Sequence, residues 1–531
     1  MINFNKILNN KYLLYSVLSG LLLGFSWPVN GFVIFIFIAF VPLLYLEELL
    51  RNKSLKKLFS YSFITFFIWN TIATWWLIHS TLFGMTFAIL VNSLLMSLVF
   101  TSYSLVSRKV HKKLGLAYFI SIWIVFEKFH LLWDFSWPWL NLGNVFSESH
   151  YLIQWYEFTG SFGGTLWVLI VNLMFLKAFK FWIINKKINI NSIAISLLFI
   201  SIPIIASLLI YSTISNEKKY IDISIIQPNI DPYTEKYGRT NLSILKDFEN
   251  MINNNGSTGN LIIAPETYFS ESPGFQIDQF KNSTFYLILN DYLKNKNEAQ
   301  LLSGIQFYKI YNSYKSKSKT SNYVKDSIWV DLYNSSFLSS NLSEPQIYHK
   351  SKLVVGVENM PYKEFLEPIL GNALLNLGGS VMSRGIQENR IAHTLNNGIK
   401  VAPIICYESV YGEYVTEYVT NGAQMLAIIT NDGWWKESQG FQQHLSYAKI
   451  RAIETRRSIA RSANTGVSAI INKKGEIIQQ LNYNTSGIIN SKIGISNNIT
   501  FYVKYGDFIY RFALFFSIII LLFSFAKKKK N

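Results

Sequence analysis

The sequence predicts an α-helical membrane bundle of eight transmembrane helices joined to one α/β domain. Half of its 531 residues are apolar, 16% are aromatic and only 15% are charged, and the mean hydropathy is +0.20. An ordinary soluble domain is less apolar and more charged. The stretch from about residue 214 to residue 505 has only short apolar runs separated by polar residues, which is typical of one globular domain.

The predicted spans are apolar runs close to the roughly 20 residues that a helix needs to cross a bilayer. They cover residues 12–28, 31–50, 59–80, 86–107, 114–132, 162–183, 192–213 and 507–526. We therefore assign residues 1–213 to a seven-helix membrane domain, 214–505 to the globular domain, and 506–531 to a last transmembrane helix with a lysine tail. No small-residue cleavage site follows the first run, so we keep it as a span.

Lysine and arginine in alternate loops predict the orientation, because positive charge stays on the cytoplasmic side. The charges before the first span and after the second, fourth and sixth are Lys6, Lys11, Arg51, Lys53, Lys56, Lys57, Arg108, Lys109, Lys112, Lys113, Lys180, Lys186 and Lys187. Both termini are then cytoplasmic, with Lys527 to Lys530 inside and the globular domain outside. Much of the net charge of +17 is explained in this way, which argues against nucleic-acid binding.

The segment WDFSWPWLNLG after the fifth span allows two interpretations. Tryptophans are common at the headgroup boundary, and interfacial anchoring would explain them. Alternatively, Trp133 to Trp139 shape a way into the protein near the outer leaflet, with Pro138 making it rigid. The sequence favours neither.

The globular domain alternates short apolar runs with polar segments. The runs are rich in isoleucine and stand in IDISIIQPN, NLIIAPE, AQLLSGIQF, SIWVDLYNSSFLSS, VAPIICYE, MLAIITND and SANTGVSAIINKKG. Short runs of this kind predict strands of sheets buried on one or both faces. The domain is therefore expected to be a layered α/β sandwich.

The chain has one cysteine, Cys406, where the apolar run VAPII stops. A lone cysteine is commonly a small buried hydrophobe. Here a strand that ends at Cys406-Tyr407-Glu408 would expose the sulfur at a corner where backbone N–H groups stabilise a thiolate or an oxyanion. We therefore treat Cys406 as a candidate nucleophile.

Two further reactive residues follow predicted strands. Glu266 lies in LIIAPET and Lys350 in IYHKSKL. Taken singly, a carboxylate in such a place can cap a helix and a lysine can be solvated. Together with Cys406 they supply a base, a cation and a nucleophile, which is a set suited to acyl transfer.

At these three residues the chain resembles the nitrilase or carbon–nitrogen hydrolase superfamily. Together with the predicted spans, it resembles one family of that superfamily, the bacterial apolipoprotein N-acyltransferases. The resemblance covers nearly the whole chain. The matching motifs are QPNIDPYTEKY, APET, YHKSKLV, ICYES, NDGWW and RSANTGVSA. It implies an αββα sandwich for the globular domain.

The resemblance also implies residue roles. Glu266 would take the thiol proton, Lys350 would stabilise the oxyanion, and Cys406 would carry the acyl group as a thioester. Supporting positions match Glu358, Tyr407 and Glu408, and the substrate pocket would include Trp434 and Tyr237. For Tyr407 and Trp434, plain core packing is an alternative explanation.

The chain departs from the family pattern in three places. The usual Leu-Val-Pro-Phe-Gly-Glu is LVVGVE here, which weakens the match of Glu358. Tyr237 replaces a tryptophan, and Lys436 replaces a glycine. These changes affect the pocket and leave the three reactive residues in place.

The implied reaction moves an acyl chain from a membrane phospholipid to the N-terminal amine of an apolipoprotein in the bacterial inner membrane. We expect a monomer, and no metal or nucleotide cofactor, since one cysteine and seven scattered histidines, including His444, give no ligand spacing. An apolar lid is a candidate at EPILGNALLNLGG, residues 367–379, with Ile369, Leu370, Leu374, Leu375 and Leu377 toward lipid. A plain buried helix explains this segment equally well.

Two other functions remain open at this point. A membrane-anchored amidase would pass its acyl group to water, yet one span would suffice as an anchor. A different class is a transporter or scaffold with an inactive appended domain. Transporters usually carry ionisable residues within their spans, and the predicted spans are nearly free of them. An inactive domain would also have no reason to keep all three reactive residues.

Overall fold

The computed structural model describes residues 11–256, 259–296, 298–340, 344–362 and 383–526. These residues form two compact units. The membrane unit contains the described residues of Met1–Ile78, Leu82–Thr213 and Tyr505–Asn531, and the αβ unit contains those of His79–Thr81 and Ile214–Lys504. The predicted lid at 367–379 lies outside the described residues.

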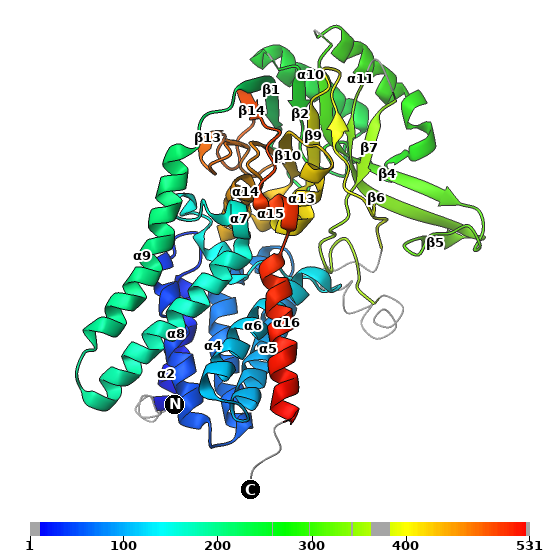
Figure 1. The fold of residues 1–531 in the computed structure, drawn as a ribbon. Helices are drawn as coiled ribbons and strands as arrows, with labels where there is room; N and C mark the ends of the chain where they lie inside the picture. Colours follow the sequence, from blue (N-terminus) through cyan, green and yellow to red (C-terminus); the bar gives the residue numbers. More distant parts are fainter. Residues whose placement is uncertain (1–10, 257–258, 297, 341–343, 363–382, 527–531) are drawn as a thin grey trace. The chain divides into compact units, whose positions relative to one another are not determined.

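The membrane unit is a bundle of apolar helices (Figure 1). Its helices are α2 (Lys11–Phe25), α3 (Val41–Leu50), α4 (Leu55–Thr74), α5 (Leu82–Ser107), α6 (Lys112–Leu132), α7 (Tyr156–Thr159), α8 (Ser161–Asn185), α9 (Ile190–Thr213) and α16 (Phe508–Ala526). Within the described residues, seven helical stretches are long and apolar enough to cross a membrane, and α2 is a shorter apolar helix. Each of the eight predicted spans thus coincides with an apolar helical segment.

The second predicted span differs from the expectation of one continuous helix. A 3₁₀ turn at Val33–Phe37 precedes α3, and the chain turns between them. The side chain of Asn172 on α8 compensates for the break, because its Oδ1 accepts from the Phe40 N–H at 2.8 Å and its Nδ2 donates to the Ile36 carbonyl at 2.8 Å. Backbone groups at membrane depth have no water to bond, so irregular backbone needs such a partner.

Buried charges in this unit have partners. Lys128 on α6 forms an ion pair with Asp507, just before α16, at 2.7 Å, and both side chains are buried. The carboxylate of Glu127 accepts hydrogen bonds from Trp123 Nε1, the Leu142 N–H and Thr165 Oγ1. These contacts tie α6 to α8 and to the start of α16.

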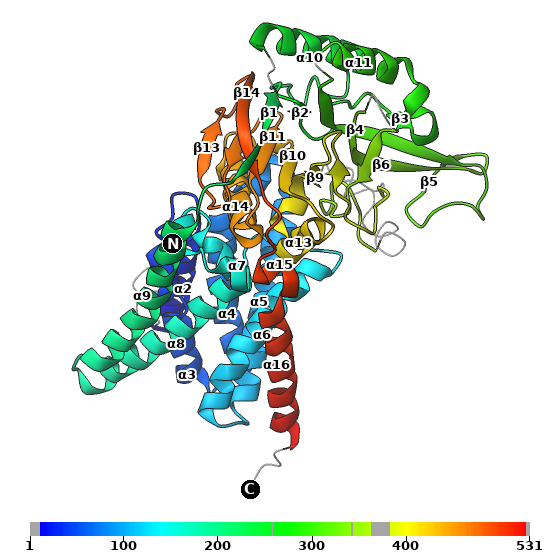
Figure 2. The same cartoon turned by 45° about the horizontal axis from the view of Figure 1, so that its top comes forward.

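The αβ unit contains two sheets (Figure 2). The described strands are β1 (Lys219–Gln227), β2 (Leu261–Ile263), β3 (Phe275–Gln276), β4 (Gln300–Tyr311), β5 (Asn322–Lys325), β6 (Ile328–Leu338), β7 (Gln346–His349), β8 (His393–Thr394), β9 (Lys400–Ile405), β10 (Met425–Thr430), β11 (Ile459–Ala463), β12 (Ala469–Ile471), β13 (Ile477–Gln480) and β14 (Gly487–Ile495). One sheet has the order β14-β1-β2-β4-β6-β5, with β3 and β7 beside it, and the other has the order β13-β12-β11-β10-β9-β8.

Alternation along the strands sorts residues between the two faces of the first sheet. In β1, Ile223 and Ile225 pack toward the second sheet, in one core with Ile404 of β9, whereas Ile226 joins a separate core on the other face. This is the period of two that a pleated strand requires. The strands are apolar on both faces because both faces are covered.

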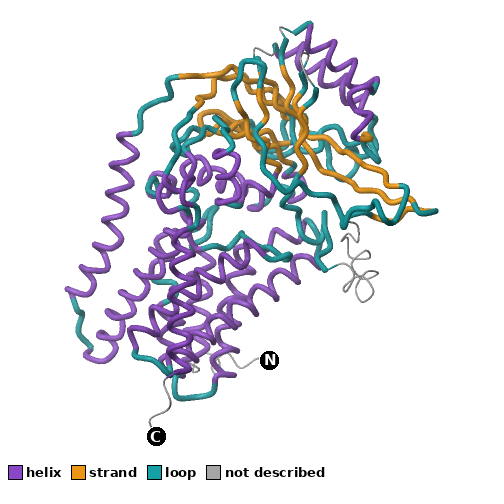
Figure 3. The backbone as a smooth tube through the Cα atoms, turned by 45° about the vertical axis from the view of Figure 1, so that its right-hand side comes forward, coloured by secondary structure: helices purple, strands orange, loops and turns teal. Residues whose placement is uncertain are grey.

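Two pairs of helices complete the layers of the αβ unit. Figure 3 shows helices lying against the strands of this unit. Helices α10 (Asn241–Asn255) and α11 (Thr284–Lys294) cover the first sheet through Phe248 and Leu289. Helices α13 (Gly412–Thr420) and α14 (Gln439–Thr455) cover the second through Val415 and Ala448. The predicted fold class, a membrane bundle with an αββα sandwich, is confirmed.

We predict that Asp507→Asn destabilises the membrane unit by about 3 kcal/mol, because it removes the negative charge that lies 2.7 Å from the buried Lys128 ammonium. Thermal unfolding of the full chain in detergent measures the loss. The double variant Lys128→Met/Asp507→Leu is the control, since it removes both charges. Equal losses in the two variants would contradict this account.

Candidate active site

Cys406 lies where β9 passes into a 3₁₀ turn, Cys406–Val410. Its φ is 50°, a left-handed conformation that is strained for a residue other than glycine and is commonly kept at functional sites. The corner at the end of a strand is as predicted. The sulfur, however, is not exposed there as expected, since Cys406 is only 7% exposed.

The electrostatics of Cys406 correct a second expectation. Burial raises the pKa of the Cys406 thiol far above its usual range, and the nearby Glu266 raises it further, while Lys350 offsets part of the rise. The corner therefore does not by itself stabilise a thiolate. The resting thiol is neutral, and a nucleophilic role requires a base.

Buried polar side chains hold the strained backbone of Cys406 in place. Its carbonyl oxygen accepts from Ser409 Oγ at 2.7 Å and lies 3.2 Å from His444 Nε2. His444 Nδ1 in turn lies 3.0 Å from Asp432, and Arg461 donates to the same carboxylate at 2.6 Å. Burial would raise the pKa of Asp432, but Arg461 and His444 outweigh it and hold that pKa well below its usual value.

Glu266 follows β2 through Pro265 and is buried. The loop that carries it runs along β4, where the Gly304 N–H donates to the Pro265 carbonyl at 3.1 Å. Thr267, directly after Glu266, has a φ of 44°. A side chain at Gly304 would collide with this loop, because its Cβ would stand 2.3 Å from the Thr267 nitrogen and 2.5 Å from the Pro265 oxygen. The glycine therefore permits the position of Glu266.

Lys350 follows β7 and is 1% exposed. Its ammonium lies 2.8 Å from a Glu266 oxygen and 2.8 Å from a Glu358 oxygen. Burial alone would lower the pKa of Lys350, but the two carboxylates outweigh it and hold that pKa well above its usual range. The lysine is thus a fixed cation between two anions.

Glu358 is placed at this cluster despite the departure of LVVGVE from the family pattern. Its carboxylate accepts from the Val354 N–H at 2.9 Å, within its own loop. Asn334 on β6 joins the two acids, since its Nδ2 donates to Glu266 at 2.8 Å and to Glu358 at 2.7 Å. Burial would raise the pKa of Glu358, but Lys350 and then Arg384 lower it on balance.

A second buried lysine, Lys236, belongs to the same region. Its ammonium donates to the backbone carbonyl of Glu266 at 3.1 Å. Burial lowers the pKa of Lys236 to about 8, although the charges of Glu266 and Cys406 oppose this. Lys236 therefore changes its charge close to the physiological range.

Glu408, two residues after Cys406, is fully buried and links two parts of the candidate site. It accepts from the Ser351 N–H at 2.7 Å, next to Lys350, and from the Ile405 N–H at 2.9 Å, next to Cys406. Three tyrosine hydroxyls also donate to it, those of Tyr348, Tyr414 and Tyr418. Burial raises the pKa of Glu408, and these hydrogen bonds offset part of the rise.

The remaining predicted residues lie around this core. Tyr407 packs edge-on against Tyr411 at 5.2 Å between ring centres. Tyr237 is 45% exposed and lies within electrostatic range of Glu266 and Lys350. Trp434 is half-buried and packs edge-on against Tyr233 at 5.1 Å. The substrate-binding roles of Tyr237 and Trp434 stay predictions.

Four contributors were not singled out from the sequence: Asn334, Lys236, Gly304 and His444 in its contact with Cys406. The sequence did contain a signal for Lys236, because this residue lies inside the motif QPNIDPYTEKY. Asn334 and Gly304 stand within ordinary strands, where their partners are remote in sequence. In the part of the chain that the structure describes, no group of three or more His, Cys, Asp or Glu residues is arranged to hold a metal ion.

Two family models match the chain, one over part of the membrane unit and the other over part of the αβ unit. The apolipoprotein N-acyltransferase N-terminal domain matches residues 19–174, and the carbon–nitrogen hydrolase matches residues 318–497. An apolipoprotein N-acyltransferase of Chlorobaculum tepidum is 27% identical over 95% of both chains. The chain belongs to the apolipoprotein N-acyltransferase family.

Other relatives in the family also align over nearly their full length. The apolipoprotein N-acyltransferase of Thermotoga maritima is 24% identical over 98% of this chain and 95% of its own. That of Rickettsia prowazekii is 26% identical over 96% of both chains. Among solved structures, a CN-hydrolase superfamily protein from Xanthomonas campestris matches 52% of this chain and 91% of its own, with 13% identity and a TM-score of 0.36.

We predict that Gly304→Ala slows acylation of Cys406 by a p-nitrophenyl ester about 100-fold. The added methyl group displaces the loop that carries Glu266, and a shift of about 1 Å in a reacting group can reduce a rate by this factor. Intact mass of the protein against time measures the rate. Gly238→Ala is the matched control, since the nearest atom to its added Cβ is 3.8 Å away. Equal rates in the two variants would show that the close approach at Gly304 does not position Glu266.

A pH prediction follows from Lys236. Its cation favours the Cys406 thiolate, so Lys236→Met is expected to slow alkylation by iodoacetamide at pH 7 about tenfold, which corresponds to a rise of one unit in the pKa of Cys406. In the unchanged protein the rate rises with pH, stays level for about one pH unit above pH 8 as Lys236 loses its proton, and then rises again. Lys236→Arg keeps the charge, and its rate continues to rise.

Because Cys406 is the one cysteine in the sequence, the increase in intact mass that is lost in Cys406→Ala reports this residue alone. Coincident pH profiles for the unchanged protein and both Lys236 variants would contradict an electrostatic effect of Lys236 on the thiol.

Proposed function

We propose that this protein transfers a fatty acyl chain from a membrane phospholipid to the N-terminal amine of the diacylglyceryl-cysteine of apolipoproteins, through a thioester on Cys406. The arrangement that carries the proposal is the buried Lys350 ammonium, held at 2.8 Å by Glu266 and at 2.8 Å by Glu358. This arrangement places a proton acceptor, Glu266, beside a fixed cation, Lys350, in the region of the buried Cys406 thiol. The family membership supplies the acceptor class.

The first half-reaction forms the thioester. Glu266 accepts the Sγ proton of Cys406 as the sulfur attacks the carbonyl carbon of a phospholipid ester. Lys350 stabilises the tetrahedral oxyanion in a site from which bulk water is largely absent, where a fixed cation is most effective. The ester C–O bond then breaks, and the proton on Glu266 passes to the leaving alkoxide, which departs as a lysophospholipid.

The second half-reaction forms the amide. The neutral N-terminal amine attacks the thioester carbonyl, and the same oxyanion site holds the negative charge. Glu266 takes a proton from the attacking nitrogen and returns it to sulfur as the C–S bond breaks. Cys406 is regenerated as a neutral thiol, which matches the raised pKa of its resting state.

Supporting roles follow from the contacts described above. Glu358 is a positioning residue, because it fixes the second side of the Lys350 ammonium. Glu408 positions the backbone beside Lys350 and Cys406, and Tyr407 packs next to it. Tyr237 and Trp434 are proposed to contact substrate.

Residues 214–505 form the catalytic domain in this proposal, and 1–213 with 506–531 form the membrane domain. The alternate loop lysines support a placement in the bacterial inner membrane with both termini cytoplasmic and the catalytic domain periplasmic. Both substrates are then lipids or lipid-modified proteins of the same bilayer. We further propose that the protein acts as a monomer.

A hydrolase or an inactive scaffold would behave differently from a transferase. An amidase of this superfamily would release the acyl group to water. The family membership and the apolar helices of the membrane unit favour a lipid-linked acceptor instead.

We predict that protein incubated with phospholipid gains the mass of one acyl chain, and that hydroxylamine removes it, as expected of a thioester. Adding a diacylated lipopeptide should discharge the chain onto the peptide amine. Glu266→Gln is expected to slow the first step by about 100-fold or more, the usual contribution of a general base. Intact-mass analysis of the protein and the peptide measures both steps.

Cys406→Ala is the control and should gain no mass. Loss of the adduct to water at the same rate with and without lipopeptide would favour the hydrolase. No adduct in the unchanged protein would favour the inactive scaffold.

A further inference from the structure

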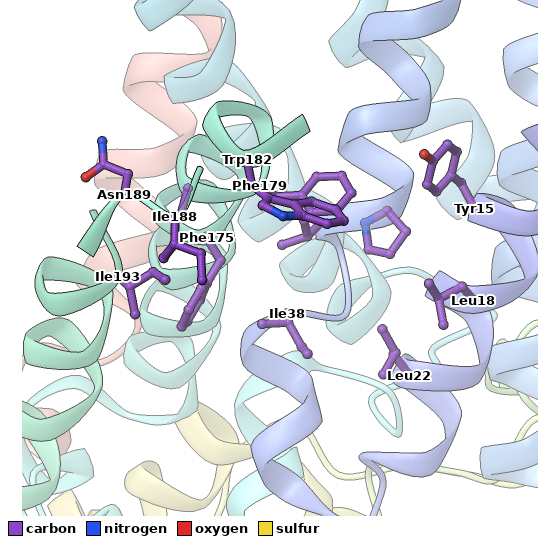
Figure 4. Close-up of a pocket in the computed structure, with 13 residues that line it drawn as sticks. Tyr15, Leu18, Leu22, Ile38, Phe175, Phe179, Trp182, Ile188, Asn189 and Ile193 are labelled. Carbon is purple, nitrogen blue, oxygen red and sulfur yellow. The ribbon is translucent and has the colours of Figure 1, made fainter. Parts of the chain in front are cut away.

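The membrane unit contains an apolar groove of about 440 Å³ that shares no residue with the candidate active site. Figure 4 shows the side chains that line it. One wall is formed by α2 through Tyr15, Leu18 and Leu22, and the other by α8 through Phe179 and Trp182. Apart from the Tyr15 hydroxyl, the indole nitrogen of Trp182 and the Asn189 amide, its lining side chains are hydrocarbon.

The packing of the neighbouring helices explains why this groove is open. Helix α2 packs on α3 and α4, and α8 packs on α3 and α9. The lining residues of α2 and α8 follow helical spacing, so each helix turns one apolar stripe toward the gap. The floor is formed by the turn before α3 and by its first residues, Val41 and Pro42. An apolar groove of this form suits a hydrocarbon chain.

One end of the groove is cationic. Asn189, Trp182 and Tyr15 lie at the level of that end, spread from one side of the groove to the other, and Leu22 and Ile38 lie farther from it (Figure 4). Lys11 begins α2, one turn before Tyr15, and Lys186 and Lys187 follow α8; all three are exposed. The Lys186 ammonium lies 6.0 Å from the centre of the Trp182 ring.

Acidic groups on the adjoining helix α3 do not cancel this charge. Glu48 pairs with Lys112 at 3.1 Å and with Lys180. Glu47 pairs with Arg51 at 2.6 Å. Each acid thus has a cation of its own, and the lysines of α2 and of the α8–α9 turn keep their positive potential.

We propose that this groove binds one phospholipid with an anionic headgroup, whose acyl chain lies along α2 and α8 and whose phosphate lies near Lys186 and Lys187. Each lysine near a bilayer surface attracts anionic lipid appreciably. Aromatic side chains such as Tyr15 and Trp182 are suited to the level between headgroup and chain. A zwitterionic lipid would fill the groove without using the lysines.

The test uses the full chain in nanodiscs that hold equal amounts of phosphatidylglycerol and phosphatidylethanolamine. Native mass spectrometry of the released protein counts the lipids that stay bound. We expect one phosphatidylglycerol to be retained in preference to phosphatidylethanolamine. Lys186→Gln/Lys187→Gln should reduce this preference about tenfold, and Lys109→Gln/Lys113→Gln, a matched pair at the α5–α6 turn, should leave it unchanged.

A second variant tests the groove itself. Leu18→Trp fills it and should abolish retention of the lipid. Leu94→Trp on α5 is the matched control, because both leucines are 42% exposed and Leu94 does not line the groove. Equal retention of the two lipids, retention unchanged by Leu18→Trp, or a second copy of the chain in place of the lipid would each overturn the proposal.

Discussion

The position of one ammonium group governs the arrangement of the candidate active site. Lys350 is buried, so it needs compensating charge, and two carboxylates from different loops supply it. Asn334 bridges the same two acids. The loops that carry Glu266 and Glu358 are therefore fixed by a shared electrostatic partner, and Glu408 joins this cluster to the strand end that carries Cys406.

The resting state of Cys406 differs from the state that its proposed role as a nucleophile requires. Burial keeps the Cys406 thiol protonated, which is compatible with an apolar surrounding in the resting protein. Reaction requires a proton acceptor and a cation at once, and these are already paired with one another before substrate arrives. Preorganised charges of this kind do not have to reorganise during the reaction.

The sequence predicted the architecture because its signals are local. Hydropathy marks the membrane helices, short isoleucine-rich runs mark the strands, and Glu266, Lys350 and Cys406 follow strands. The depth of Cys406, the bridge made by Asn334 and the repair of the broken span by Asn172 depend on partners remote in the chain, which no local pattern encodes. The altered loop LVVGVE weakens the sequence match of Glu358 to the family pattern. The Glu358 carboxylate is nevertheless held by a backbone N–H and by Asn334, and neither contact needs the missing proline.

The burial of a single cysteine has a consequence for redox chemistry. In the orientation proposed here, Cys406 would work in a compartment whose machinery oxidises thiols. Such oxidation proceeds through a thiolate that another sulfur or an oxidant can reach, and the protonated thiol of Cys406, a residue only 7% exposed, offers neither. The burial that makes a base necessary in the proposed acyl transfer would thus also protect Cys406 from mixed-disulfide formation and from oxidation to sulfenic acid.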